Sequence, residues 1–159
     1  MADTAAEIDA GVERALDRLY NTNAGTRAIV ESAVGALVFP DVKKGGLGVG
    51  GQYGEGSLLE DGQTVGYYSV AAGSLGLQIG FQRRSEIYLF MNYEALDAFK
   101  ANDGWEVGLD GSVAIIDMGG GKSLDPKTIK DPIVGFILSN KGFMANLTVE
   151  GTKISKIER

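Results

Sequence analysis

The sequence predicts an α+β domain, in which two N-terminal helices precede a strongly curved, mainly antiparallel β-sheet with one inserted helix. Apolar residues recur at helical spacing over residues 1–33, whereas short runs of alternating residues follow over residues 34–159. Glycine accounts for 24 of the 159 residues. Abundant glycine within strands is typical of sheets that bend into a barrel or a sandwich. The length suits a single domain spanning residues 1–159.

The first segment has the pattern of an amphipathic helix. Four of its apolar residues recur three or four positions apart, namely Ile8, Val12, Ala15 and Leu19. The stretch 21–25 ends this helix, and Thr26 is expected to cap a second, shorter helix that runs to about Ser32. Because the polar face of the first helix is acidic, we expect it to pack on its own domain rather than on a membrane surface.

The stretch 43–58, KKGGLGVGGQYGEGSL, contains seven glycines in the twelve residues from Gly45 to Gly56. Leu47 and Val49 alternate with three of these glycines, which predicts a strand with one bare face. Each strand glycine costs roughly 0.5–1 kcal/mol relative to alanine. We therefore expect another element to cover the bare face closely, or the strand to bend there.

The remaining elements follow from turn and cap signals. After an apolar run at 34–39, strands are expected at about 46–59, 63–72, 75–82 and 86–91. The pair Asp61-Gly62 suits a hairpin turn. Asn92 is expected to cap a helix near 93–101, which Gly104 terminates.

The last third of the chain resumes as strands. One or two strands are expected over 105–117, followed by a loop over 121–131. Residues 133–139 and 143–156 are expected to form a closing hairpin around Asn140-Lys141-Gly142.

Two glycine motifs resemble nucleotide-binding signatures, but neither has the context that such a site needs. Residues 46–51 match G-x-G-x-x-G, yet a poor helix start follows them and no carboxylate lies about twenty positions further on. Gly121-Lys122-Ser123 lacks the upstream glycine of a phosphate-binding P-loop, because Ile116 occupies that position. Both motifs are interpreted as glycine-rich strand and turn.

Residue types exclude most catalytic chemistry. The chain contains no histidine and no cysteine, which excludes Ser-His-Asp and Cys-His catalysis and the usual zinc sites. Glu94 and Asp97 are interpreted as the solvated face of a helix, and Asp117 as a turn residue. We therefore expect no enzymatic activity, no cofactor and no metal.

The charge balance constrains the partners. A net charge of −6 argues against binding to nucleic acid, which needs a basic surface. The region 117–159 nevertheless carries seven bases against five acids, which leaves room for a local cationic face. No apolar run is long enough to span a membrane, and no leader with an apolar core begins the chain.

Several blocks resemble the SYLF-domain family. Residues 36–40 (ALVFP) and 44–51 (KGGLGVGG) resemble the opening of that domain. Later blocks follow in the same order, at residues 62–68, 76–80, 103–108, 122–124 and 147–154. The resemblance covers roughly Ala10 to the C-terminus and is closest to the bacterial branch of the family.

This resemblance implies a function. Eukaryotic members bind anionic phospholipids, including phosphoinositides, and some act on actin. The implied role is non-enzymatic binding to an anionic membrane surface, without actin, which a bacterium lacks. Bacterial members commonly carry secretion or lipoprotein signals, so we expect a periplasmic, membrane-anchored lipoprotein whose native product is longer at its N-terminus. Two alternatives stay open: a structural module that binds another envelope protein, and a carrier that holds a small molecule inside the barrel.

Five basic residues are the candidate lipid contacts, namely Lys43, Lys44, Arg83, Arg84 and Lys122. They are expected in three loops: before the glycine-rich strand, in a tight turn after Phe81, and after the glycines at 119–121. Function concentrates in loops, and loop N–H groups can bind phosphate oxygens. The alternative is that these are ordinary solubilising charges.

Overall fold

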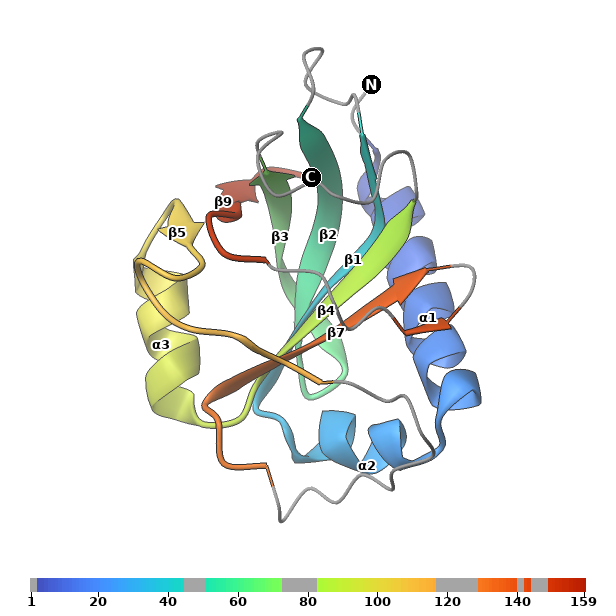
Figure 1. Ribbon diagram of the computed structural model, residues 1–159. Coiled ribbons are helices and arrows are strands. Elements are labelled where there is room, and N and C mark those ends of the chain that lie inside the picture. The colour runs from blue at the N-terminus through green and yellow to red at the C-terminus, as the bar shows by residue number, and fades with distance from the viewer. Residues whose placement is uncertain (1–2, 45–50, 73–82, 117–128, 140–141, 144–148) are drawn as a thin grey trace.

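The computed structural model describes residues 3–44, 51–72, 83–116, 129–139, 142–143 and 149–159 (Figure 1). The three helices of these ranges are α1 (Ala5–Thr22), α2 (Gly25–Ser32) and α3 (Tyr93–Ala101). The nine strands of the same ranges are β1 (Gly35–Lys44), β2 (Gln52–Glu60), β3 (Gln63–Ala72), β4 (Arg84–Phe90), β5 (Trp105–Glu106), β6 (Ala114–Ile115), β7 (Ile133–Ser139), β8 (Gly142–Phe143) and β9 (Lys153–Ile157).

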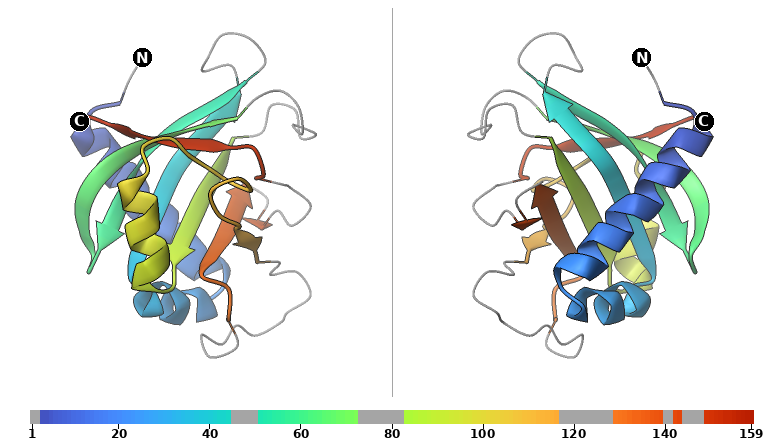
Figure 2. Two further views of the ribbon diagram at one scale, coloured as in Figure 1. Left: turned by 90° about the vertical axis from the view of Figure 1, so that its left-hand side faces the viewer. Right: turned by 90° about the vertical axis from the view of Figure 1, so that its right-hand side faces the viewer.

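All nine strands belong to one sheet, in the order β5-β9-β3-β2-β1-β4-β7-β6, with β8 paired to β7. Every pairing between them is antiparallel except that of β6 with β7. The sheet is strongly curved into a half-barrel, with α1 lying diagonally across one face (Figure 2). This architecture confirms the predicted α+β class and its mainly antiparallel sheet.

Two apolar cores occupy the two faces of the sheet. On the outer face, the predicted stripe of α1 is buried against residues such as Val38 and Ile87. On the inner face, Leu96 and Phe99 of α3 pack against strand residues such as Phe90. Phe99 lies with its ring centroid 4.9 Å from that of Phe90 and 5.6 Å from that of Trp105. Alternating side chains of one sheet therefore serve both cores.

The helix caps agree only partly with the sequence prediction. Asn92 caps α3 as predicted, since its side chain accepts a 2.8 Å hydrogen bond from the Ala95 N–H. The predicted cap of α2 is wrong, because Thr26 lies inside that helix and is fully buried. Its hydroxyl lies within hydrogen-bond distance of the Leu19 and Asn23 carbonyls and so ties the start of α2 to the end of α1.

The glycine-rich strand bends, as far as it is described. Strand β1 shifts register against β2 between Val38 and Lys43, and a Cβ on Gly56 would overlap the Val38 carbonyl. The two backbones thus approach more closely than any side chain at position 56 would allow. Within the described residues, strand β2 begins at Gln52. The predicted bare face at Gly46, Gly48 and Gly50, the predicted strand at 75–82 and most of the loop at 121–131 lie outside the described residues.

The two predicted hairpins have different outcomes. Asp61 and Gly62 have φ angles of 54° and 75°, which confirms the predicted turn between β2 and β3. The closing hairpin is right only at its start, where Ser139 pairs with Gly142. Strand β9 pairs instead with β3 and β5. The residues between β8 and position 149 lie outside the described residues, so the outcome of the hairpin is known only for its first two pairs and for β9.

A polar triad lies within the inner face of β4. Arg84, Glu86 and Tyr88 alternate along the strand and are at most 6% exposed. Glu86 accepts hydrogen bonds from Arg84 Nε at 2.7 Å and from the Tyr88 hydroxyl at 2.5 Å. Burial, followed by the nearby Glu86 charge, raises the pKa of Tyr88 well above its ordinary value, so the phenol stays protonated and donates. Arg84 is therefore a strand residue with a buried partner, not the turn residue that was predicted.

Candidate functional site

Strand β1 shifts register against both β2 and β4 around Pro40, and we call this place the kink of β1. Three exposed arginines surround the kink, and we call the hollow between them the arginine groove. Arg14 and Arg18 come from α1, and Arg83 directly precedes β4. The groove consists of two adjoining hollows of about 370 and 360 Å³, which share Arg18, Pro40 and Asp41 as lining residues. Cations from distant parts of the sequence thus converge on one part of the described surface.

Local packing holds the two sides of this groove together. Arg14 and Arg18 are one helical turn apart and lie on one flank of α1. One turn earlier, Gly11 lets α1 approach β1, because a Cβ there would lie 3.0 Å from Pro40 Cγ. Arg18 donates to the Ser139 carbonyl at 3.0 Å and to Ser85 Oγ at 3.4 Å. These bonds fix Arg18 over the strands while its surroundings stay open to solvent.

The remaining charges of the groove are weakly paired. Arg83 Nε lies 3.6 Å from Asp41 Oδ1, and these side chains are 69% and 45% exposed. Exposed ion pairs contribute at most about 1 kcal/mol, so Arg83 can exchange this partner for a ligand anion. Lys43 is exposed and lies next to Val42, which pairs with Arg84. Lys43 of β1 therefore lies beside Arg83, the residue just before β4.

The five sequence-predicted cations do not share one surface. Lys43 and Arg83 lie close together, whereas strand alternation turns Arg84 to the opposite, buried face. The side chain of Lys44 and the whole of Lys122 lie outside the described residues. Whether these five residues bind lipid stays a prediction.

Sequence reasoning missed Arg14 and Arg18, because it judged α1 by its acidic polar face as a whole. The available signal was their spacing of four residues, which places both arginines on one flank of a helix. Nothing in the sequence indicated that this flank lies beside the kink of β1.

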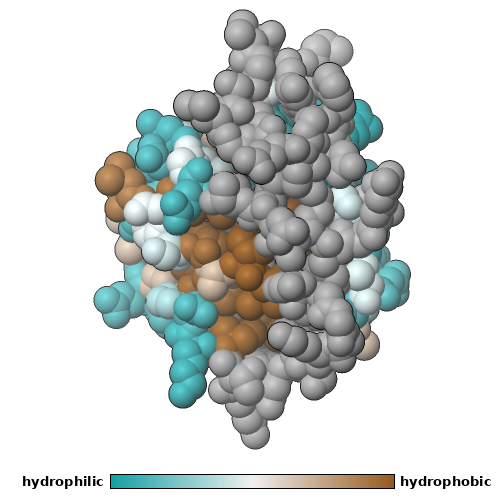
Figure 3. Space-filling view, in the orientation of Figure 1, coloured by the Kyte–Doolittle hydropathy of each residue, from teal (hydrophilic) through white to brown (hydrophobic). Residues whose placement is uncertain are grey.

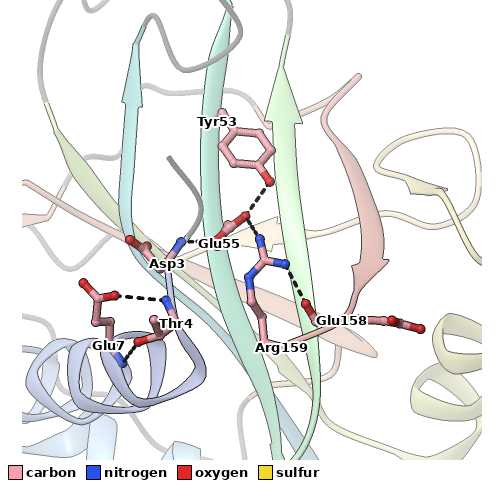
Figure 4. Close-up of polar contacts among 7 residues, drawn as sticks. All are labelled: Asp3, Thr4, Glu7, Tyr53, Glu55, Glu158 and Arg159. Carbon is pink, nitrogen blue, oxygen red and sulfur yellow. Dashed lines mark hydrogen bonds and ion pairs between the residues drawn. The ribbon is translucent and has the colours of Figure 1, made fainter.

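A network around Glu55 borders the groove through Asp3 (Figure 4). The Glu55 carboxylate is 5% exposed and accepts hydrogen bonds from the Tyr53 hydroxyl at 2.7 Å, the Asp3 N–H at 3.0 Å, and Arg159. Burial alone would raise the pKa of Glu55, but these three donors together outweigh it and lower the pKa. The carboxylate is consequently ionised and held by three donors, which suits a structural clamp rather than an acid–base catalyst.

The described surface offers few other chemical sites. Apolar residues gather near the centre of the face shown in Figure 3. Among the described residues, no three acidic side chains are grouped so that they could hold a metal ion. None of the described helices is both long and apolar enough to cross a bilayer.

Comparison with known proteins gives one family. The model of the Ysc84 family, described as Las17-binding protein actin regulator, matches residues 71–158. This range covers more than half of the chain and runs from the end of β3 to the end of β9. A search of curated proteins found no match. Arg83 lies within the matched range, whereas Arg14 and Arg18 of the groove and the adjacent Lys43 precede it.

Proposed function

This chain belongs to the Ysc84 (SYLF-domain) family, and we propose that it is a non-enzymatic domain that binds anionic phospholipid surfaces. The observation that carries this proposal is the convergence of Arg14, Arg18 and Arg83 on one groove, with Lys43 beside it. Arginine forms bidentate hydrogen bonds with phosphate oxygens, which favours phosphate headgroups over carboxylates alone. The absence of histidine and cysteine from the sequence supports a binding role rather than catalysis.

The electrostatic balance explains how an acidic protein could bind an anionic surface. The net charge of −6 disfavours approach in most orientations. Each lysine or arginine near an anionic membrane contributes about 1 kcal/mol. The three arginines and the adjacent Lys43 could therefore outweigh the repulsion from the acids of the same hollows, Asp3, Glu7 and Asp41, when this side faces the lipid. The binding we propose is therefore oriented, and it weakens as salt increases.

The finer parts of the proposal concern lipid class and location. Phosphoinositide-type headgroups are the proposed class, because several phosphates could engage separate arginines. Resemblance to the bacterial branch of the family supports a periplasmic, membrane-anchored lipoprotein. On the same ground we expect no actin partner for this chain, although the family's description includes actin regulation.

Co-sedimentation with vesicles tests the proposal. We expect the protein to sediment with vesicles of phosphatidylcholine plus phosphatidylglycerol or a phosphatidylinositol phosphate, but not with phosphatidylcholine alone. The triple variant Arg14→Ser/Lys43→Ser/Arg83→Ser should bind roughly a hundredfold more weakly, at about 1 kcal/mol per lost cation. Arg18 is left intact, because its bonds to Ser139 and Ser85 also hold the fold.

A matched control separates the groove from net charge. The variant Arg27→Ser/Lys130→Ser/Lys153→Ser loses the same charge from exposed positions outside the groove. Equal losses in the two variants would show that binding follows overall charge and not this groove. Failure of the parent to bind any of these vesicles would favour the alternative function, a module that binds another envelope protein.

A further inference from the structure

A second groove, which we call the acidic groove, lies between the helices and the β2–β3 turn. It is a hollow of about 550 Å³ that extends from the end of α1 and α2 to the hairpin tip and the start of α3. Its apolar lining includes Leu16, Val30, Val34 and Leu59, all of which are half-buried. A hollow of this size and lining can accept one or two apolar side chains of a partner.

The rim of the acidic groove carries carboxylates from two separate elements. Glu31 lies in the last turn of α2, and Glu60 and Asp61 lie at the hairpin tip. Lys100 pairs with Glu60 at 2.7 Å, whereas Glu31 and Asp61 have no salt bridge within the described part of the chain. The negative end of the α2 dipole adds to the field of Glu31. Arg27 lies one helical turn from Glu31 and places its guanidinium over the ring of Tyr20, which also lines the groove. The three carboxylates nevertheless outnumber Arg27 and Lys100, so the rim keeps a net negative charge.

Helix α1 separates this groove from the arginine groove. Leu16 and Tyr20 line the acidic groove, whereas Arg14 and Arg18 line the other. An offset of two residues corresponds to about 200° around a helix, so the two pairs lie on nearly opposite flanks. A cationic ligand in the acidic groove and an anionic ligand in the arginine groove can therefore bind at the same time.

We propose that the acidic groove binds a short basic segment of a partner protein, in which an apolar anchor residue is flanked by lysine or arginine. The apolar lining receives the anchor, and Glu31 and Asp61 pair with the flanking cations. Tyr93 also lines the groove and is 66% exposed, so its ring can make a cation–π contact with a lysine or arginine of the partner. The negative rim disfavours anionic lipid and nucleic acid at this place.

Peptide selection on the full chain tests this proposal. A random dodecapeptide display library is selected on the immobilised protein, and enriched peptides are synthesised with a dye and titrated by fluorescence anisotropy. We expect the enriched peptides to combine an apolar residue with two or more lysines or arginines. The variant Glu31→Gln/Asp61→Asn should bind them about fivefold or more weakly, through the loss of two ion pairs.

The matched control is Glu13→Gln/Asp97→Asn, which removes the same charge from exposed positions outside the groove and should leave binding unchanged. Asparagine suits the positive φ of Asp61, so the test variant keeps its turn. The proposal is overturned if no peptide is enriched, if the peptides lack excess positive charge, or if both variants bind equally. Concentration-dependent dimerisation that only the groove variant abolishes would overturn it in favour of a second copy of this chain.

Discussion

Arg84 and Glu86 form a buried ion pair, with 2.7 Å between Arg84 Nε and Glu86 Oε2, on the inner face of β4. Tyr88 completes the set by donating to the other carboxylate oxygen. Removing one partner of such a pair leaves a charge without compensation in a dry environment. Arg84 consequently holds the fold, whereas its neighbour Arg83 lies at the surface.

We predict that Arg84→Met destabilises the protein by about 3–5 kcal/mol, because Glu86 is left buried without its cation. For a domain of this size the melting temperature should fall by roughly 10 °C or more. Thermal unfolding followed by circular dichroism measures this. Arg83→Met is the matched control and should change stability by less than about 0.5 kcal/mol.

The same triad predicts a rescue. The triple variant Arg84→Met/Glu86→Leu/Tyr88→Phe removes all three polar groups together, so no buried charge is left alone. We expect it to melt well above Arg84→Met. A triple variant as unstable as the single variant would contradict this account and point to a packing role for the guanidinium stem.

Glycine at position 56 is predicted to be irreplaceable. In Gly56→Ala the new methyl group would overlap the Val38 carbonyl, and backbone rather than a flexible side chain must then move. We expect a loss of about 1–3 kcal/mol or more in chemical denaturation. Gly66→Ala on the neighbouring strand is the control, since its Cβ would meet only Tyr68 at 3.5 Å. Equal stability of the two variants would show that the sheet relaxes at position 56.

The Glu55 network predicts a pH dependence of stability. Because folding lowers the pKa of Glu55, its contribution is present above the unfolded-state pKa of about 4.3 and is lost as pH falls through the lower, folded-state pKa. Glu55→Gln should be less stable than the parent by about 1–3 kcal/mol at pH 7, and the difference should shrink towards pH 3. Urea unfolding at both pH values measures this. A stability difference that does not change with pH would show that ionisation of Glu55 does not stabilise the fold. Glu13→Gln is the control for the change in net charge.

Asp41 is predicted to oppose lipid binding. Its carboxylate lies 3.6 Å from Arg83 and lines both hollows of the arginine groove. Asp41→Asn should therefore bind anionic vesicles several-fold more tightly, since removal of one like charge near the surface is worth about 1 kcal/mol. Vesicle titration at low salt measures the gain. Unchanged or weaker binding would indicate that lipid does not approach this groove.

Local sequence patterns were sufficient for the helices and the first hairpin. The apolar stripe of α1, the Asn92 cap and the Asp61-Gly62 turn each depend on residues a few positions apart, so their physics is contained in the sequence. The glycine content correctly indicated a bent sheet, because glycine costs stability in a strand unless another backbone approaches closely. The family resemblance was likewise visible in the order of its blocks, and the family match over 71–158 confirms it.

Pairing across the chain decided the rest. Nothing local distinguishes Arg83 from Arg84, yet alternation along β4 exposes one and buries the other beside Glu86. Strand β9 pairs with β3 and β5 instead of β7, and these pairings join strands that are distant in the sequence. Arg14 became a groove residue only because Gly11 let α1 settle against the kink at Pro40. The sequence by itself thus determined which segments form helices and turns, since short-range periodicity and caps set them. The tertiary structure alone decided which charges meet, because that depends on strand register and on how closely two backbones can approach.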